Sequence, residues 1–333
     1  MRTSQKLTHA LLALAALVVL ASAALAQLPG TPWPATDEIN DQKAGSVLIY
    51  TVYSSSAANA NAENTRFNLT NTSSVSSAFV HLFFVDGNSC SVADAFICLT
   101  PNQTTSFLAS DVDPGTMGFV VAVAASPITG CPINFNFLIG DEFVKFATGH
   151  AANLGAEAIA AILTTPVESC NAASVSADLA FNGVAYNRLP RVLAADSIGS
   201  PADGDSTLLV IDRIGGNLLT GTGTIGNLFG ILFDEAEHGF SFTFFSAACQ
   251  VKAILSDSFP RTTPRFSAAI PAGSHGWLKI FNPNVDRGYL GAEITRNANS
   301  ASAAGAFNGG HNLHKLTLTA AETLLIPIFP PTC

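Results

Sequence analysis

The sequence predicts an all-β protein made of two tandem antiparallel β-sandwich domains related by internal duplication. Three observations lead to this prediction: a dense series of short strand patterns with little helix, turn dipeptides between them, and matches between the two halves at a nearly constant spacing. The chain has 333 residues, of which 48% are hydrophobic and 12% are charged. A disordered protein would be less apolar and more highly charged.

The first 26 residues have the pattern of a secretory signal peptide. Arg2 and Lys6 precede an apolar stretch at 10–20, and Ala24-Leu25-Ala26 provides a small-x-small cleavage signal. The apolar stretch is shorter than the roughly 20 residues that a membrane-spanning helix needs. We therefore expect a secreted protein, extracellular or periplasmic, with no transmembrane anchor after cleavage.

Residues 27–44 contain three prolines and are predicted to form an extended leader. The first half then has strand patterns at 46–53, 66–70, 78–86, 104–109, 118–124 and 133–139. The second half has them at 207–214, 226–234, 239–247, 251–256, 276–282, 289–296 and 323–329. Phe240, Phe242 and Phe244 alternate with Ser and Thr, which indicates a strand with one buried face. Only the alanine-rich segment 151–163 has a helical pattern.

Matches between the two halves suggest that the chain arose by duplication. Cys90 aligns with Cys249 at a spacing of 159, and Gly118 aligns with Gly276 at a spacing of 158. The alternative to duplication is a chance match, because any two β segments with apolar alternation can be placed in partial register. The predicted divisions are a β-sandwich domain at 45–165, a connecting segment and hinge at 166–204, and a second β-sandwich domain at 205–333.

Six cysteines in an exported chain predict disulfide bonds, with free buried thiols as the alternative. Cys90 and Cys98 are the predicted local pair, because eight residues are enough for a hairpin return. The pairing of the other four is left open: Cys131, Cys170, Cys249 and Cys333.

The densest ionisable cluster is Asp234-Glu235-Ala236-Glu237-His238. Asp234, Glu237 and His238 are candidate catalytic residues, since carboxylates beside an imidazole can serve as acid and base. The cluster lies between two apolar strand patterns, so a solvated turn is the favoured interpretation. The Gly221-x-Gly223-x-x-Gly226 pattern also runs into a strand, and we interpret it as a hairpin loop rather than a nucleotide site.

Two pairs of aspartates are candidate calcium ligands: Asp111 with Asp113, and Asp203 with Asp205. Neither pair belongs to a complete EF-hand loop, and Asp is common in turns because it bonds its own backbone. We therefore expect no cofactor, with calcium as the alternative.

His150 and His311 occupy matching places in the proposed repeat, and His314 follows His311 by three residues. On a helix, His311 and His314 would share a face and could bind a metal. A structural role in a duplicated fold explains the recurrence more simply.

We expect a non-enzymatic exported protein with a surface-structural, adhesion or ligand-binding role. Carbohydrate, other surface proteins or further copies of the chain are its expected partners. Nucleic acid is not expected, because the net charge is −9 with only 15 Lys and Arg. The alternative is a secreted hydrolase of uncommon type that uses the Asp234, Glu237 and His238 cluster.

Overall fold

The computed structural model describes residues 38–297 and 307–330, which belong to one compact unit, Pro34–Cys333. The predicted signal peptide and most of the predicted leader lie outside the described residues. No helix in these two ranges is long and apolar enough to cross a membrane. The described chain is all-β and carries disulfide bonds.

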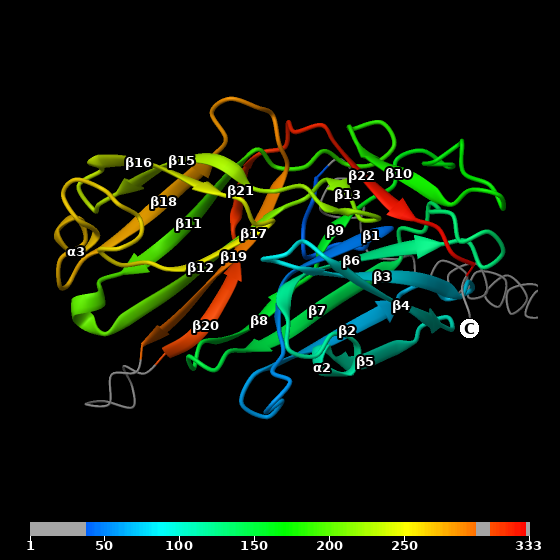
Figure 1. Ribbon diagram of the computed structural model, residues 1–333, viewed down its shortest axis with the longest axis horizontal. Helices are drawn as coiled ribbons and strands as arrows, with labels where there is room; N and C mark the ends of the chain where they lie inside the picture. The colour runs from blue at the N-terminus through cyan, green and yellow to red at the C-terminus, as the bar shows by residue number, and fades with distance from the viewer. Residues whose placement is uncertain (1–37, 298–306, 331–333) are drawn as a thin grey trace, which may run out of the picture. The chain divides into compact units, whose positions relative to one another are not determined.

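The strands form five sheets of four or five strands each (Figure 1). Sheet 1 has the order β4 (Val92–Leu99), β3 (Ala78–Asp86), β6 (Met117–Ala125), β1 (Val47–Ser54) and β9 (Glu157–Ile159). Sheet 2 has the order β5 (Thr104–Leu108), β2 (Asn64–Asn71), β7 (Leu138–Lys145) and β8 (Ala151–Gly155). Sheet 3 has the order β16 (Gly239–Ser246), β15 (Gly226–Phe233), β18 (His275–Phe281), β11 (Val192–Gly199) and β21 (His314–Thr317).

Sheet 4 has the order β17 (Gln250–Ile254), β12 (Asp205–Arg213), β19 (Tyr289–Asn297) and β20 (Phe307–Asn312). Sheet 5 has the order β10 (Ser176–Phe181), β22 (Glu322–Pro327), β13 (Gly216–Asn217) and β14 (Gly221–Thr222). The short helices are α2 (Ala109–Val112), the 3₁₀ turn η1 (Pro201–Asp203) and α3 (Phe266–Ala269).

The prediction of two tandem β-sandwich domains is wrong: the five sheets are arranged as a five-bladed β-propeller. Two sandwiches would need four sheets, whereas here a fifth sheet joins β10 to β22 (Figure 1). Every residue of β1 is buried, on both faces of the strand. A strand of a simple sandwich would leave one face in water.

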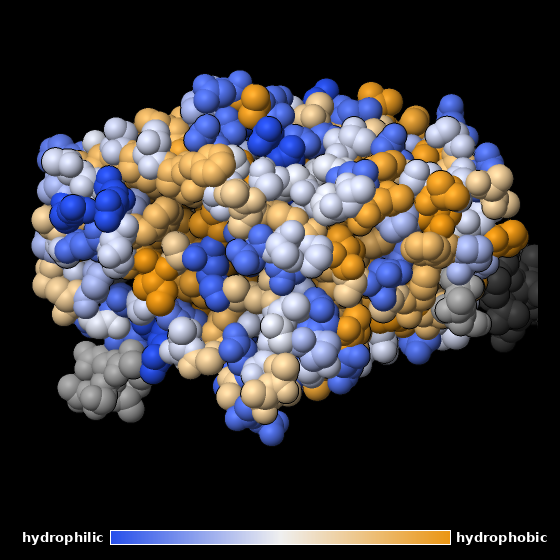
Figure 2. Space-filling view, in the orientation of Figure 1, coloured by the Kyte–Doolittle hydropathy of each residue, from blue (hydrophilic) through white to orange (hydrophobic). Residues whose placement is uncertain are grey.

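Four apolar cores lie between pairs of sheets. They pack sheet 1 against sheet 5, sheet 1 against sheet 2, sheet 2 against sheet 4, and sheet 3 against sheet 4. Phe242 belongs to the last core, and Phe240 and Phe244 pack against it, so the predicted alternation in this strand is confirmed. Apolar and polar side chains are intermixed on the face that Figure 2 shows, as is usual for a protein surface.

The strand order repeats between sheets. Sheets 1 and 3 have the same connectivity, as do sheets 2 and 4, and α2 and α3 occupy equivalent places. Counted from their first residues, equivalent strands lie 141–148 residues apart before the short helices and 151–158 after them. The spacing of about 159 inferred from the sequence is therefore too large for the earlier strands. Cys90 precedes β4, whereas Cys249 follows β16, the equivalent of β4.

The segment 151–163, predicted to be helical, forms β8 and β9 instead. Ala152, Ala156 and Ala158 are buried, so these small side chains fill the space where sheets approach closely. Tertiary packing overrides the helix propensity of alanine. The predicted hinge at 166–204 contains β10 and β11, and the last part of the predicted leader contributes a bridge between Asn40 and Ala158.

The predicted Cys90–Cys98 pair is also wrong, because Cys90 is bonded to Cys249 with the Cα atoms 5.7 Å apart. Cys98 pairs with Phe79 at the far end of the β3–β4 ladder, while Cys90 lies in the turn. The extended strand that leads from this turn to Cys98 spans about 20 Å, well beyond the reach of a disulfide. A second bond joins Cys131 to Cys170, and Cys98 is also in a disulfide.

We expect the Cys90–Cys249 bond to stabilise the fold more than the Cys131–Cys170 bond does. The two bonds close loops with sequence separations of 159 and 39 residues, and chain entropy then favours the longer loop by about 1 kcal/mol. Urea unfolding of the Cys90→Ala/Cys249→Ala and Cys131→Ala/Cys170→Ala variants measures the two losses. Equal losses, or a larger loss for the second variant, would contradict this expectation.

Two carboxylic acids are fully buried between sheets 2 and 4. Glu142 accepts a hydrogen bond from the backbone N–H of Val52 at 3.1 Å, and Asp212 accepts one from Gln250 Nε2 at 2.8 Å. Within the described residues, the second oxygen of each carboxyl has no hydrogen-bond partner. Burial raises the pKa of both groups, and the charge of Asp212 raises the pKa of Glu142 further.

Because burial raises the pKa of both acids, we predict that the folded protein loses stability as the pH rises. In the unfolded chain Glu142 ionises near its usual pKa of about 4.3, whereas the folded protein retains the proton to higher pH. In Glu142→Gln, an amide oxygen still accepts from Val52 but the ionisable group is gone. The unfolding free energy of this variant should therefore fall less than that of the wild type between pH 5 and pH 8. Urea unfolding measures both free energies across that range. If they fall by the same amount in Glu142→Gln and in the wild type, the prediction is wrong.

Candidate functional site

The candidate catalytic cluster forms an exposed turn between β15 and β16. Asp234 accepts hydrogen bonds from the backbone N–H groups of Ala236 and His238, and from His238 Nδ1 at 3.0 Å. These bonds hold the pKa of Asp234 below its usual value. Glu237 adopts a left-handed φ of 64°, as turn residues do. The geometry is that of a self-bonded turn.

The four candidate calcium ligands have protein partners. Asp113 accepts from the Tyr53 hydroxyl at 2.6 Å, and Asp111 lies in α2 and accepts from the backbone N–H of Leu108. The other pair is used in the same way: Asp203 accepts from the backbone N–H of Gly273, and Asp205 accepts from Asn297 Nδ2.

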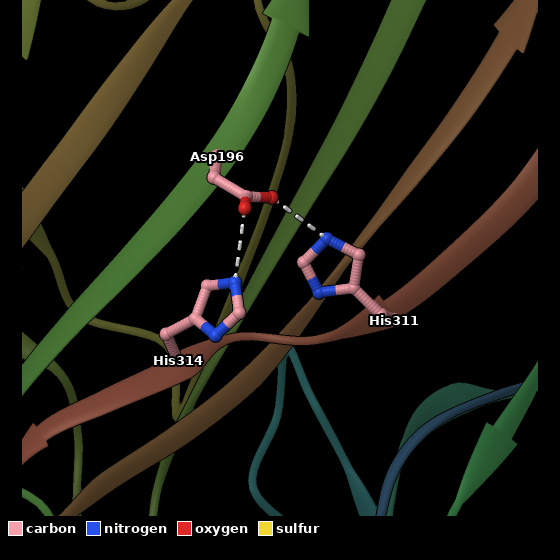
Figure 3. Close-up of side chains that lie close together, drawn as sticks. All are labelled: Asp196, His311 and His314. Carbon is pink, nitrogen blue, oxygen red and sulfur yellow. Dashed lines mark hydrogen bonds and ion pairs between the residues drawn. The ribbon is translucent and has the colours of Figure 1, made fainter.

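The two matched histidines do not have matching roles. His150 is buried, and its Nε2 lies 2.9 Å from the carbonyl of Ser206, so it joins two parts of the chain. Burial lowers its pKa. His311 instead lies beside His314 and Asp196 (Figure 3). The donor atoms of these three side chains all lie within 4.8 Å of one another, the one such group in residues 38–297 and 307–330.

This group, which we call the histidine–aspartate cluster (Asp196, His311 and His314), opens into a cavity of about 920 Å³. The cavity lies where the edge strands β20 and β21 meet, and the segment 38–42 also lines it. One lysine and five acidic residues line the cavity. The acidic residues are Glu38, Asp41, Asp196, Asp205 and Glu293. The lysine, Lys315, forms an ion pair with the buried Glu157.

The crossing from β20 to β21 brings the two histidines together. In a continuous strand, residues three apart point to opposite faces. Here the chain leaves sheet 4 after Asn312 and enters sheet 3 at His314, with only the buried Leu313 between them. The chain is not helical at these two residues, and the crossing places both imidazoles beside one cavity.

A β-bulge and a cross-strand pair supply the carboxylates. The register of β11 against β18 shifts between Ala195 and Ile198, and Ser197 has a φ of 53°. Bulges of this kind re-aim side chains, and Asp196 within it faces the histidines (Figure 3). Glu293 in β19 is the direct cross-strand partner of His311 in β20.

His311 is held as an imidazolium. Its Nδ1 lies 2.8 Å from the carbonyl oxygen of Asn312, which can only accept, so Nδ1 carries a proton. Its Nε2 faces Glu293 Oε1 at 2.9 Å and Asp196 Oδ1 at 3.1 Å. The hydrogen bond to Glu293 is the main reason that the pKa of His311 rises to about 9. Burial raises the pKa of Glu293, and the imidazolium partly offsets this.

Comparisons with known proteins add no function. No protein-family model matches the chain, and no curated protein matches it. One solved structure, of a Bacteroides fragilis protein proposed to be a β-galactosidase, aligns with 91% of this chain at 11% identity and a TM-score of 0.15. The aligned part of this chain spans 36% of that protein. A likeness this weak supports no argument about fold or activity.

Sequence reasoning noted His311 and His314 but missed Asp196 and Glu293. Asp196 follows a short apolar run, Val192–Ala195, where a charge ends the pattern and thus hints at a bulge. Glu293 stands within the otherwise apolar and neutral stretch 289–295, where a single acidic residue is a signal of a buried charge with a partner.

We expect Glu293→Gln to lower the pKa of His311 from about 9 back toward 6.5, because the variant removes the main stabilising partner of the imidazolium. NMR titration of the His311 ring in the presence of EDTA measures this pKa. Asp196→Asn is the matched control and should lower it less, since the Asp196 charge is the weaker influence. The reverse order would show that Glu293 is not the main partner.

Proposed function

We propose that the chain is an exported, non-enzymatic binding protein whose cavity takes a small cationic ligand. The observation that carries this proposal is the charge of the cavity: five carboxylates line it, against the His311 imidazolium and one lysine that is already paired with Glu157. A concave site in which negative charges outnumber positive ones concentrates cationic ligands.

Export is supported by two independent features. The first 26 residues have the pattern of a signal peptide, and the described chain contains disulfide bonds, which persist mainly in oxidising compartments. A protein outside the cytoplasm meets inorganic cations, polyamines and cationic side chains of other molecules, all of which fit the charge of the cavity.

The surface-structural and adhesive roles, with carbohydrate, surface proteins or further copies of the chain as partners, stay predictions. So does the hydrolase alternative. Its residues Asp234, Glu237 and His238 are not among those that line the 920 Å³ cavity.

We expect at least one member of a panel of small cations to bind once per chain. The panel consists of the chlorides of zinc, calcium and magnesium, together with spermidine and arginine methyl ester. Isothermal titration calorimetry measures binding to the metal-stripped full-length protein. Asp196→Asn should weaken the binding, because it removes one of the carboxylates in the cavity.

Asp178→Asn is the matched control, because this exposed aspartate in β10 lies outside the cavity. It removes the same charge and should leave binding unchanged. If no member of the panel binds, or if both variants weaken binding equally, the cavity is not a specific cation site and the proposal is wrong.

A further inference from the structure

The geometry points to a divalent transition-metal ion as the cationic ligand, and we infer that Asp196, His311 and His314 hold it. This inference rests on the proposed function and makes it specific, since it names both the class of cation and its ligands. Zinc is the representative ion of this class.

The separations between donor atoms fit a tetrahedral site. Zinc binds imidazole nitrogen and carboxylate oxygen at about 2.0–2.2 Å, so neighbouring ligand atoms of a tetrahedron lie about 3.4 Å apart. His311 Nε2 lies 3.1 Å from Asp196 Oδ1 and 2.9 Å from Glu293 Oε1. His314 Nε2 lies 3.2 Å from Asp196 Oδ2. The ligand atoms of Asp196, His311 and His314 already lie within 4.8 Å of one another, so small side-chain adjustments would bring these three onto one ion and leave its fourth position open.

The ring orientation of His311 suits a metal ligand. A histidine ligand usually donates its second ring N–H to a carbonyl or carboxylate, which fixes the tautomer. The Asn312 carbonyl fills this role for Nδ1 at 2.8 Å, so Nε2 is the nitrogen left for the ion. Asp196 lies between the two histidines and directs one oxygen toward each ring (Figure 3).

Glu293 provides an independent observation. It is only 5% exposed and lines the cavity, yet its Oε2 has no hydrogen-bond partner within the described residues. A buried carboxylate oxygen without a partner is costly, and an ion bound beside it would remove that cost. Glu293 Oε1 lies 2.9 Å from His311 Nε2, so its charge would stabilise an ion bound at that nitrogen, although Glu293 is not one of the three clustered ligands.

The types of donor select the class of metal. Calcium and magnesium prefer shells of six or more oxygens, whereas this site offers two imidazoles and the Asp196 carboxylate. Imidazole with carboxylate suits zinc, copper, nickel and iron. Asp196 and His314 are half-exposed, so the ion has a path from solvent.

Calorimetric titration of zinc chloride into the metal-stripped full-length protein tests the inference. We expect one zinc ion per chain, and we expect His314→Gln and Asp196→Asn each to weaken zinc affinity at least about tenfold. Because both side chains are half-exposed, these variants should fold normally, and circular dichroism checks that they do.

His275→Gln is the matched control, because His275 lines the same cavity but faces Glu235 instead of the cluster. It should keep zinc affinity within about twofold of the wild type. Cobalt offers a second readout, since Co²⁺ absorbs visible light far more strongly in a tetrahedral protein site than in water. That absorption should appear with the wild type and His275→Gln and be lost with His314→Gln.

The outcomes separate this inference from the broader proposal. If zinc does not bind, or binds unchanged in His314→Gln, the metal site is wrong. If spermidine, arginine methyl ester or calcium then still binds and depends on Asp196, the cationic binding function survives without the metal. If no member of the panel binds, both fail.

Discussion

The structure depends on the burial of sheet 1 on both faces. β1 and β6 are buried along almost their whole length, and apolar cores lie on either side of them. Water is excluded between these layers, so any polar group there needs a protein partner. The Thr51 hydroxyl donates to Asn312, and Arg213 pairs with Glu322, across sequence separations of more than 100 residues. These contacts join the sheets into one unit.

The same constraint explains where the titratable cluster lies. A fold in which each sheet packs against a neighbouring sheet leaves few places for charged side chains other than turns and the edges of sheets. β20 and β21 are edge strands of neighbouring sheets, and the chain passes from one to the other through the single residue Leu313. The histidines on either side of that residue meet the bulge at Asp196 and the cross-strand partner Glu293. The cavity is thus a product of sheet geometry more than of a local motif.

Local patterns in the sequence predicted local structure well. The strand at 78–86 was predicted with the same bounds as β3, and the alternating phenylalanines of β16 pack as expected. The predictions that were wrong concern features set by contacts between residues far apart in the sequence. The alanines at 151–163 form strands because sheets pack closely around them, and Cys90 reaches Cys249 because sheets 1 and 4 come together. Asp196 lies 97 residues before Glu293, and no periodicity in the sequence relates them.

The Cys90–Cys249 bond has a consequence for how the protein is made. During synthesis Cys90 emerges long before Cys249, and Cys98, Cys131 and Cys170 emerge between them. While more than a hundred further residues are added, the Cys90 thiol can therefore meet only cysteines to which it is not bonded in the native fold. Correct oxidation therefore has to wait for the late strands, or an early pairing has to be exchanged by thiol–disulfide attack. The order of the cysteines along the chain makes oxidative folding a matter of timing as well as of chemistry.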